Sequence, residues 1–395
     1  MMNFMEATPG ISTCKNDGIL NPSCIQSDQT IGDLSQWESR AKMDHASWGG
    51  SSNTPTNQRK GVPIEVLVEL ANQTMTNPWF TMPHYADDDY VTQFASYINE
   101  HLNSQLKVYL EYSNEVSWNP GFVAFYYTQA KGIEAGYDSI PDEFSNLSDS
   151  SRDKNYFARL RYYAQRSIEI FDLWTDAGFA SSRLIRVAGS FQGDTVLSQQ
   201  ILNHNNGGHF DALAIAPYFY GCSKRIGSCA DTETINKVLS EVTTVDEIFE
   251  IIDDPDAPNA LANTIQKISN HAAIARSAGV KLTTYEGGQH LTATLAGIGD
   301  LSEGDKTRLR GLFQDANRDP RMKDRYITLL NAWKAADNTA LFSLYTLPQS
   351  YYRYGNWGIK EHLGQNRANA PKFDAAMTFQ ESIGACWWSD CATEE

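Results

Sequence analysis

The sequence predicts an α/β fold built on a parallel sheet that is either open or closed into a barrel. Short apolar runs alternate with amphipathic stretches, and the helix-like stretch Pro63–Gln73 followed by the run Pro78–Met82 is a clear example. Parallel strands are buried on both faces, so they appear as continuous apolar runs between helices. The chain has 395 residues, which suits one large barrel or two to three smaller domains. No low-complexity linker divides it, so we expect one domain over residues 1–395.

Each predicted strand is a short apolar or β-branched run. The run KVYLEY is rich in β-formers, ALAIAPY is continuously apolar, and the long helical stretch Asn155–Ala177 precedes the strand IRVAG. Seven segments are predicted to be strands: Met2–Ala7, Pro78–Met82, Lys107–Tyr112, Ile185–Gly189, Ala212–Tyr218, Val280–Tyr285 and Ala340–Tyr345. Residues 8–60 and 221–259 lack this regularity and are expected to be long loops, which are usually functional or disordered.

The charge and the motifs that are missing exclude several kinds of partner. The chain has 32 Lys and Arg against 48 Asp and Glu, a net charge of −16. Nucleic acids and anionic membrane surfaces bind basic patches, so neither is expected as a partner. No apolar run is long enough to cross a membrane. No phosphate loop, dinucleotide motif or zinc-ligand spacing occurs, and the acidic run DDPD lacks the spacing of a calcium loop. We therefore expect no cofactor and no metal.

The six cysteines form three pairs that are close in sequence: Cys14 and Cys24, Cys222 and Cys229, Cys386 and Cys391. An even count in local pairs predicts three disulfides that close short loops, with six free thiols as the alternative. Because disulfides persist in oxidising compartments, we expect a secreted or otherwise extracytoplasmic protein. Residues 1–10 contain no basic segment followed by an apolar stretch, so we expect this chain to lack its signal peptide.

Two predicted strands end in a glutamate flanked by aromatic residues. Glu115 follows the strand VYLEY in the sequence YSNEV, and Glu286 follows KLTTY in the sequence YEGG. The carboxyl ends of barrel strands converge on the active site. Two carboxylates are the minimum machinery for glycoside hydrolysis, because one holds the proton for the leaving oxygen and the other attacks the anomeric carbon. Alternatively, each glutamate is a solvated loop residue or a helix cap.

The context of these glutamates resembles the retaining (β/α)8 barrels of clan A of the glycoside hydrolases. The stretch VYLEYSNEVSWN resembles the strand-four signature of that clan, and YEGG is similar to the clan's sequence at the end of strand seven. Three stretches also resemble bacterial putative glycosidases of the clan that are often labelled cellulose-binding proteins: GVPIEVLVELANQ, NPWFTMPHYADDDYV and YLEYSNEV. The resemblance covers the chain from Met2 to about Phe379. It implies a (β/α)8 TIM-type barrel with long loop insertions.

The resemblance also implies roles for individual residues. Glu115 would be the acid/base, Glu286 the nucleophile, and Asn114 the partner of the sugar 2-hydroxyl. Tyr218 would orient the nucleophile, and Trp357 would be an aromatic platform under the reacting sugar. Tyr218 could instead be a core residue, and Trp357 a surface or core residue.

Further residues are expected around this site. His84 is expected to line the pocket or to be structural, and Trp118 is a candidate for sugar stacking, as are Trp37 and Trp48. The three aspartates after His84, residues 87–89, are expected to begin the next helix, where the helix dipole favours anions.

The sequence departs from the clan pattern in two ways. Ser117 gives EVSWN where EVWN is expected, and Met1–Gly10 contains no arginine although the clan carries one near the end of strand two. Met2–Ala7 then corresponds to strand two, so either the first βα unit lies upstream of this chain or its place is filled otherwise.

We expect a monomeric glycosidase that acts on a polysaccharide or oligosaccharide. The alternative from another class is a non-catalytic carbohydrate-binding protein on a degenerate glycosidase barrel, which the two departures favour. A lyase or esterase on an unrelated α/β barrel would need a different set of catalytic residues, and none is apparent in the sequence.

Overall fold

The computed structural model shows an α/β fold with a five-stranded sheet in the order β1-β2-β3-β4-β6. A second sheet pairs β5 with β7. The structure describes residues 36–45, 48, 61–120, 122–144, 152–220, 241–292, 302–339, 341–352 and 355–385. The described strands form no closed barrel. The chain divides into two compact units: Met1–Ala214 with Ile274–Val280, called unit 1, and Ile215–Ala273 with Lys281–Glu395, called unit 2.

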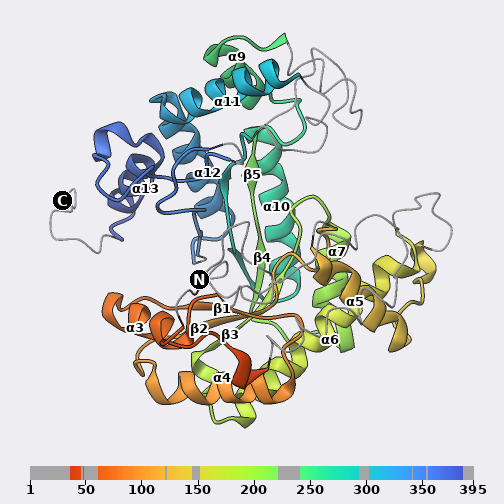
Figure 1. Cartoon of the computed structure of the whole chain (residues 1–395). Helices are drawn as coiled ribbons and strands as arrows, with labels where there is room; N and C mark the ends of the chain where they lie inside the picture. The colour runs from red at the N-terminus through yellow and green to blue at the C-terminus, as the bar shows by residue number, and fades with distance from the viewer. Residues whose placement is uncertain are drawn as a thin grey trace. The chain divides into compact units, whose positions relative to one another are not determined.

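Unit 1 is built on parallel strands that lie next to one another in Figure 1: β1 (Trp79–Met82), β2 (Val108–Tyr112), β3 (Leu184–Gly189) and the start of β4 (Ala212–Ile215). Met82 pairs with Tyr112, and Gly189 pairs with Ala214. Since parallel strands in register end at one edge of a sheet, the segments that follow β1, β2 and β3 emerge at the same edge of unit 1.

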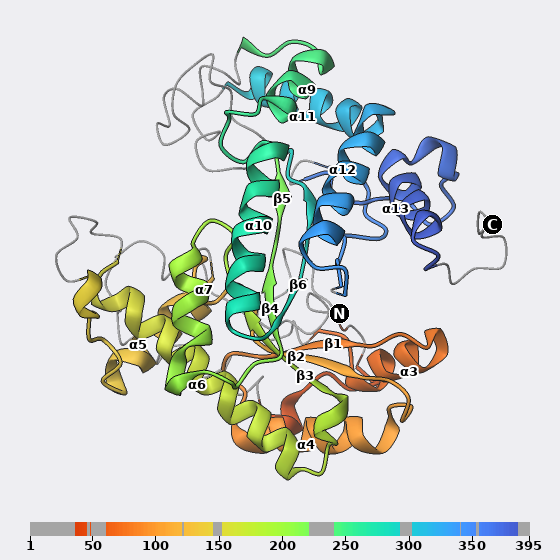
Figure 2. The same ribbon diagram turned by 180° about the vertical axis from the view of Figure 1, so that it is seen from behind.

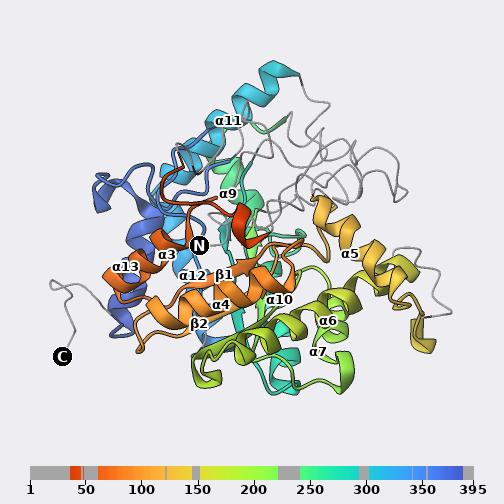
Figure 3. The same ribbon diagram turned by 60° about the horizontal axis from the view of Figure 1, so that its bottom comes forward.

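Unit 1 also contains the helices α3 (Ile64–Thr74), α4 (Asp88–His101), α5 (Val123–Glu134), α6 (Lys154–Asp176) and α7 (Thr195–Leu202). Of these, α6 packs against β2 and β3, and α7 packs against β3. Asp87, Asp153 and Asp194 begin α4, α6 and α7, because each carboxylate accepts a backbone N–H of the first turn. The expectation that residues 87–89 begin a helix is therefore confirmed. Figure 3 shows α6 running beside α5, which it packs against.

Unit 2 contains the short strands β5 (Tyr218–Phe219) and β7 (Gly288–Gln289) and the strand β6 (Lys281–Thr284). Pro217 separates β5 from β4, because proline cannot donate to a sheet ladder. Its helices are α9 (Val245–Asp253), α11 (Glu303–Arg318), α12 (Arg321–Ala336), α13 (Pro371–Ser382) and most of α10 (Leu261–Ser277). Figure 2 shows α12 next to α13.

Short 3-10 helices complete the described elements: η3 (Trp37–Ser39), η5 (Asp142–Phe144), η6 (Ser181–Arg183), η7 (His204–Asn206) and η9 (Arg367–Asn369). None of the described helices is both long and apolar enough to span a membrane.

Most predicted elements within the described residues are confirmed. Strands form within the predicted segments Pro78–Met82, Lys107–Tyr112, Ile185–Gly189 and Val280–Tyr285, as do the helices expected near 63–73 and 155–177. The predicted strand Ala212–Tyr218 is divided into β4 and the start of β5. Met2–Ala7 and all six cysteines lie outside the described residues, so the expected seventh strand and the disulfides stay predictions. The single domain over residues 1–395 also stays a prediction.

The strand predicted at Ala340–Tyr345 is wrong, because residues 341–345 have no regular structure. The segment lies beside β6, but threonine hydroxyls take part in the pairing. Thr283 Oγ1 donates to the Leu341 carbonyl at 3.0 Å, and Thr284 Oγ1 accepts from Ser343 N–H at 2.5 Å. Side-chain groups that bond to backbone compete with a regular ladder.

The predicted loop 221–259 is also corrected, because α9 occupies Val245–Asp253. Thr244 accepts the Glu247 N–H, and the Glu247 carboxylate accepts the Thr244 N–H, so the two residues form a capping box. The Thr-x-x-Glu spacing carried this signal in the sequence. Residues 221–240 lie outside the described chain, as do most of the residues of the other predicted loop, 8–60.

Candidate active site

The segment after β2 carries Asn114 and Glu115 in an unusual backbone conformation. Ser113 has φ +58° and Glu115 has φ +51°, in the left-handed region that non-glycine residues seldom occupy. The Ser113 N–H still donates to the Met82 carbonyl at 2.8 Å, so the sheet holds the segment up to this point. Strained residues at a strand end are concentrated at functional sites, where the surrounding structure maintains them.

The Glu115 carboxylate is fixed by a neighbour in its own turn. Asn119 Nδ2 donates to Glu115 Oε2 at 2.7 Å, and the backbone N–H groups of Trp118 and Asn119 donate to the Glu115 carbonyl. Asn114 is 7% exposed, and its Oδ1 has no hydrogen-bond partner within the described chain. An unsatisfied buried acceptor beside Glu115 suits a ligand hydroxyl, because burying a polar atom without a partner is costly.

An aromatic pair lies at the same edge of unit 1. Trp118 stacks on Phe191, which follows β3, with ring centroids 6.4 Å apart and planes 19° apart. Phe191 is 42% exposed, so a large apolar face beside the Glu115 turn meets solvent. The parallel register of β2 and β3 brings these two segments together.

His84 follows β1 and is buried among aromatic rings at the same edge. Its ring lies 4.2 Å from Tyr85 and 5.4 Å from Tyr127, and its carbonyl accepts the Tyr112 hydroxyl at 3.0 Å. With 2% exposure, His84 has the environment of a packed side chain.

The second glutamate, Glu286, lies in unit 2 between β6 and β7. The Tyr218 hydroxyl donates to Glu286 Oε2 at 2.8 Å. Tyr218 begins β5 and pairs with Gly288 in parallel register, two positions after Glu286. The register therefore accounts for the contact, and both side chains are half-buried.

Aromatic rings surround this pair. The His290 ring stands edge-on to Tyr218 at 4.9 Å and to Trp357 at 5.5 Å, and Tyr345 lies 5.9 Å from Trp357. Burial lowers the pKa of His290 to about 4. The imidazole is therefore neutral near pH 7 and adds no positive charge beside Glu286.

Glycines allow this arrangement at two points. Gly288 has φ +134°, and a Cβ there would lie 2.5 Å from the Tyr326 hydroxyl. A Cβ on Gly355 would collide with the Trp357 ring. The glycines of the motifs YEGG and YGNWG are thus required by close approach.

The structure brings the predicted site residues together in two sets. Tyr218, Glu286 and Trp357 form a group around His290 in unit 2, as the distances above show. His84, Asn114, Glu115 and Trp118 follow neighbouring strands of unit 1. Of the other two tryptophans, Trp37 lies in η3 and stands edge-on to Tyr90 at 5.9 Å, and Trp48 is half-buried.

Sequence reasoning assigned no role to Asn119, Phe191, His290 or Tyr345, all of which contact the predicted residues. Asn119 and His290 each lie four residues after a candidate glutamate, and this spacing was the available signal. No sequence signal distinguished Phe191 and Tyr345, because aromatic residues are common in protein cores.

The comparisons establish no family for this chain, because no family model, no curated protein and no solved structure matches it. No cluster of metal-ligating side chains occurs among the residues that the structure describes.

Proposed function

We propose that this protein is a retaining glycoside hydrolase that cleaves β-glycosidic bonds of a polysaccharide or oligosaccharide. Glu286 is the nucleophile and Glu115 the acid/base. The observation that carries the proposal is the 2.8 Å hydrogen bond from Tyr218 to Glu286 inside an aromatic enclosure. A phenol that donates to a carboxylate favours its ionised form and turns the carboxylate toward one orientation, as a nucleophile requires.

The proposed reaction has two steps. Glu115 gives its proton to the glycosidic oxygen while the Glu286 carboxylate attacks the anomeric carbon, which forms a glycosyl ester and releases the leaving sugar. Glu115, now ionised, takes a proton from water as the water oxygen attacks the anomeric carbon. The C–O bond to Glu286 breaks, and both glutamates return to their starting states.

Neighbouring groups support both steps. The Asn119 amide orients the Glu115 carboxyl group, and Asn114 Oδ1 accepts the sugar 2-hydroxyl. Trp357 offers an aromatic face to the sugar. This face stabilises the positive charge that develops on the sugar ring in the transition state.

Two finer features belong to the same proposal. The parallel sheet is part of a (β/α)8 barrel, which the alternation of strands and helices supports. The mature protein is secreted with three local disulfides, which the cysteine spacing supports. Mass spectrometry of an unreduced digest tests the disulfides, and free thiols at all six cysteines would contradict them.

The test is a screen of polysaccharides with detection of new reducing ends, followed by Glu286→Ala and Glu115→Ala. Both variants should lose turnover and keep the thermal unfolding midpoint. Glu69→Ala, at an exposed position of α3, is the control and should retain activity. Full activity in both site variants would refute the proposal.

Added azide distinguishes the two roles. In Glu286→Ala, azide should attack in place of the nucleophile and give a glycosyl azide of inverted configuration. In Glu115→Ala, azide should open the glycosyl-enzyme and give a glycosyl azide of retained configuration.

A crystal structure should place the Glu115 and Glu286 carboxyl groups about 5–5.5 Å apart, and a much larger separation would exclude the retaining mechanism. Glycan binding without any product would instead identify a carbohydrate-binding protein.

A further inference from the structure

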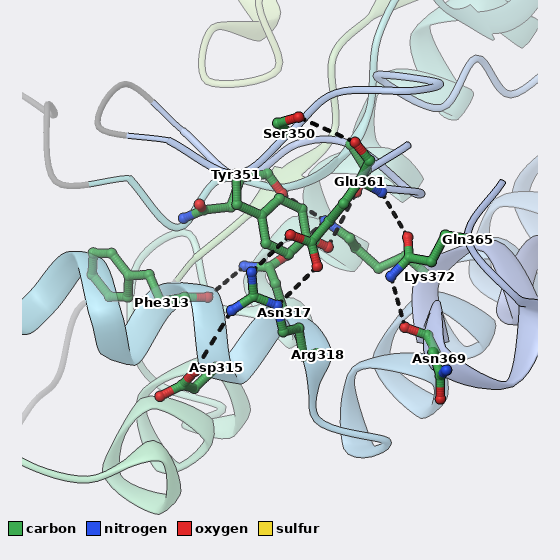
Figure 4. Close-up of polar contacts among 12 residues, drawn as sticks. Phe313, Asp315, Asn317, Arg318, Ser350, Tyr351, Glu361, Gln365, Asn369 and Lys372 are labelled. Carbon is green, nitrogen blue, oxygen red and sulfur yellow. Dashed lines mark hydrogen bonds and ion pairs between the residues drawn. The ribbon is translucent and has the colours of Figure 1, made fainter. Parts of the chain in front are cut away.

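A fully buried lysine lies at the centre of a polar cluster in unit 2, which Figure 4 shows. Lys372 on α13 is 0% exposed. Its Nζ donates to Asn317 Oδ1 on α11 at 2.7 Å and to the Asn356 carbonyl at 2.6 Å. Nζ also lies 4.6 Å from the centre of the Tyr351 ring. A side chain without exposure cannot contact a substrate, so any effect on the reaction is indirect.

Burying this lysine is costly, and the cluster compensates only in part. Burial lowers the pKa of Lys372 well below its usual value, and the nearby Glu361 carboxylate opposes that shift. Glu361 already accepts two hydrogen bonds from Arg318, at 2.8 and 2.7 Å, so Lys372 is not needed to neutralise it. The role of Lys372 therefore lies in its hydrogen bonds to Asn317 Oδ1 and to the Asn356 carbonyl oxygen.

The Asn356 carbonyl is where two segments of unit 2 are joined. It also accepts a hydrogen bond from Gln289 Nε2 at 2.9 Å. Gln289 Oε1 accepts the Leu291 N–H at 2.7 Å, and the Gln289 N–H donates to the Tyr326 hydroxyl at 3.0 Å. The Gln289 side chain therefore bonds to both the Asn356 carbonyl and the Leu291 N–H, so the residues on both sides of His290 are tied to Asn356.

The two aromatic rings next to Glu286 are direct neighbours of these fixed residues. His290 lies between Gln289 and Leu291, and Trp357 follows Asn356 in the chain. Their rings meet edge to face at 5.5 Å. Lys372 and Gln289 bind the same carbonyl oxygen, and Asn356 Nδ2 also donates to the Leu291 carbonyl at 3.2 Å. The lysine is therefore one of three groups that fix where Trp357 begins relative to His290.

We propose that Lys372 is a positioning residue that holds the Asn356 carbonyl and thereby sets the Trp357 ring against His290, beside the Tyr218–Glu286 pair. Its consequence for catalysis rests on the proposed function, while the link from Lys372 to Trp357 does not. A lysine suits this task because its amino nitrogen can donate to two acceptors on separate segments. Loss of Nζ leaves Asn317 Oδ1 buried without this donor, and the Asn356 carbonyl keeps only the bond from Gln289.

The first experiment measures the Trp357 environment without any substrate. The chain has nine tryptophans, so the protein is labelled with 5-fluorotryptophan, and Trp357→Phe assigns one ¹⁹F signal. Lys372→Met should shift or broaden the Trp357 signal and leave the signal of Trp174, which is buried in unit 1, unchanged. An unchanged Trp357 signal would overturn the proposal.

A matched control separates positioning from loss of stability. Arg367→Met removes ion pairs to Asp374 and Glu381 on the same helix, α13, without touching Asn356. It should lower the unfolding midpoint and leave the Trp357 signal in place. An equal change of that signal in both variants would overturn the proposal, because general loosening of α13 would then explain it. If Lys372→Met does not fold, Lys372→Gln takes its place, because it keeps a polar donor that is too short to reach both acceptors.

The second experiment measures kinetics on a glycan that the screen identifies. Lys372→Met should raise KM about 2- to 10-fold, the scale of one aromatic contact, with a smaller effect on kcat, whereas Arg367→Met should change neither. Unaltered kinetics despite a displaced Trp357 signal would overturn the catalytic part of the proposal. If wild-type protein turns over no glycan while the signal still moves, the proposed function fails and the positioning link stands.

Discussion

Asn119 donates its side-chain amide to Glu115 at 2.7 Å, across a single turn in which Glu115 itself has a left-handed backbone. This contact fixes the orientation of the carboxyl group proposed as the acid/base. The turn follows directly from the sheet of unit 1, so a rigid element supports it.

Asn119→Ala should weaken the acid role of Glu115. A hydrogen bond to a charged group contributes about 1.5–3 kcal/mol, so kcat/KM on an oligosaccharide should fall roughly 10- to 100-fold. The loss should be smaller for an aryl glycoside with a good leaving group, which needs little protonation. Steady-state kinetics on both substrates measure this, with the exposed Gln93→Ala as control. Equal losses on the two substrates would contradict the assigned role.

Tyr218→Phe should reduce the reactivity of Glu286 and keep the aromatic enclosure. Loss of the phenol donor disfavours the carboxylate, so the acidic limb of the kcat/KM profile should move to higher pH and kcat should fall about 10-fold or more. Tyr220→Phe is the matched control, since the Tyr220 ring also faces His290, at 5.9 Å. A profile that is the same in Tyr218→Phe and the wild type would exclude an orienting role for the hydroxyl.

Phe191→Ala should weaken binding of the leaving sugar, because the exposed ring lies on Trp118 next to the Glu115 turn. An aromatic contact contributes about 0.5–1.5 kcal/mol, so KM for oligosaccharides should rise roughly 2- to 10-fold. KM for a small aryl glycoside should stay the same. Leu363→Ala, which is 72% exposed in the wild type, is the control. A rise in KM for both substrates would place Phe191 elsewhere in the mechanism.

His290 should make stability depend on pH on the acidic side. Its pKa is about 4 in the folded protein and about 6.5 in an unfolded chain, so the unfolded state binds more protons between these values. The free energy of unfolding should therefore fall as pH drops from about 6.5 to about 4. Urea unfolding at several pH values tests this on wild type and His290→Gln. The wild type should lose more stability over that interval, and parallel curves would contradict the prediction.

The sequence by itself determined the local elements. Buried parallel strands such as VYLEY leave a continuous apolar run, and Asp87 before a helical stretch predicts a cap, because both signals lie within a few residues of one another. The candidate glutamates were found in the same way, from their positions directly after strands.

Only the tertiary structure decided which distant side chains meet. The contact of Tyr218 with Glu286 depends on the parallel register of β5 and β7. The segment 341–345 bonds to β6 partly through threonine hydroxyls and does not form a regular strand. Lys372 appears in the sequence as an ordinary charged residue. It became the centre of a buried cluster because α11, α13 and the segment around Asn356 converge on one point. Such convergence depends on packing between elements, which local propensity and spacing do not encode.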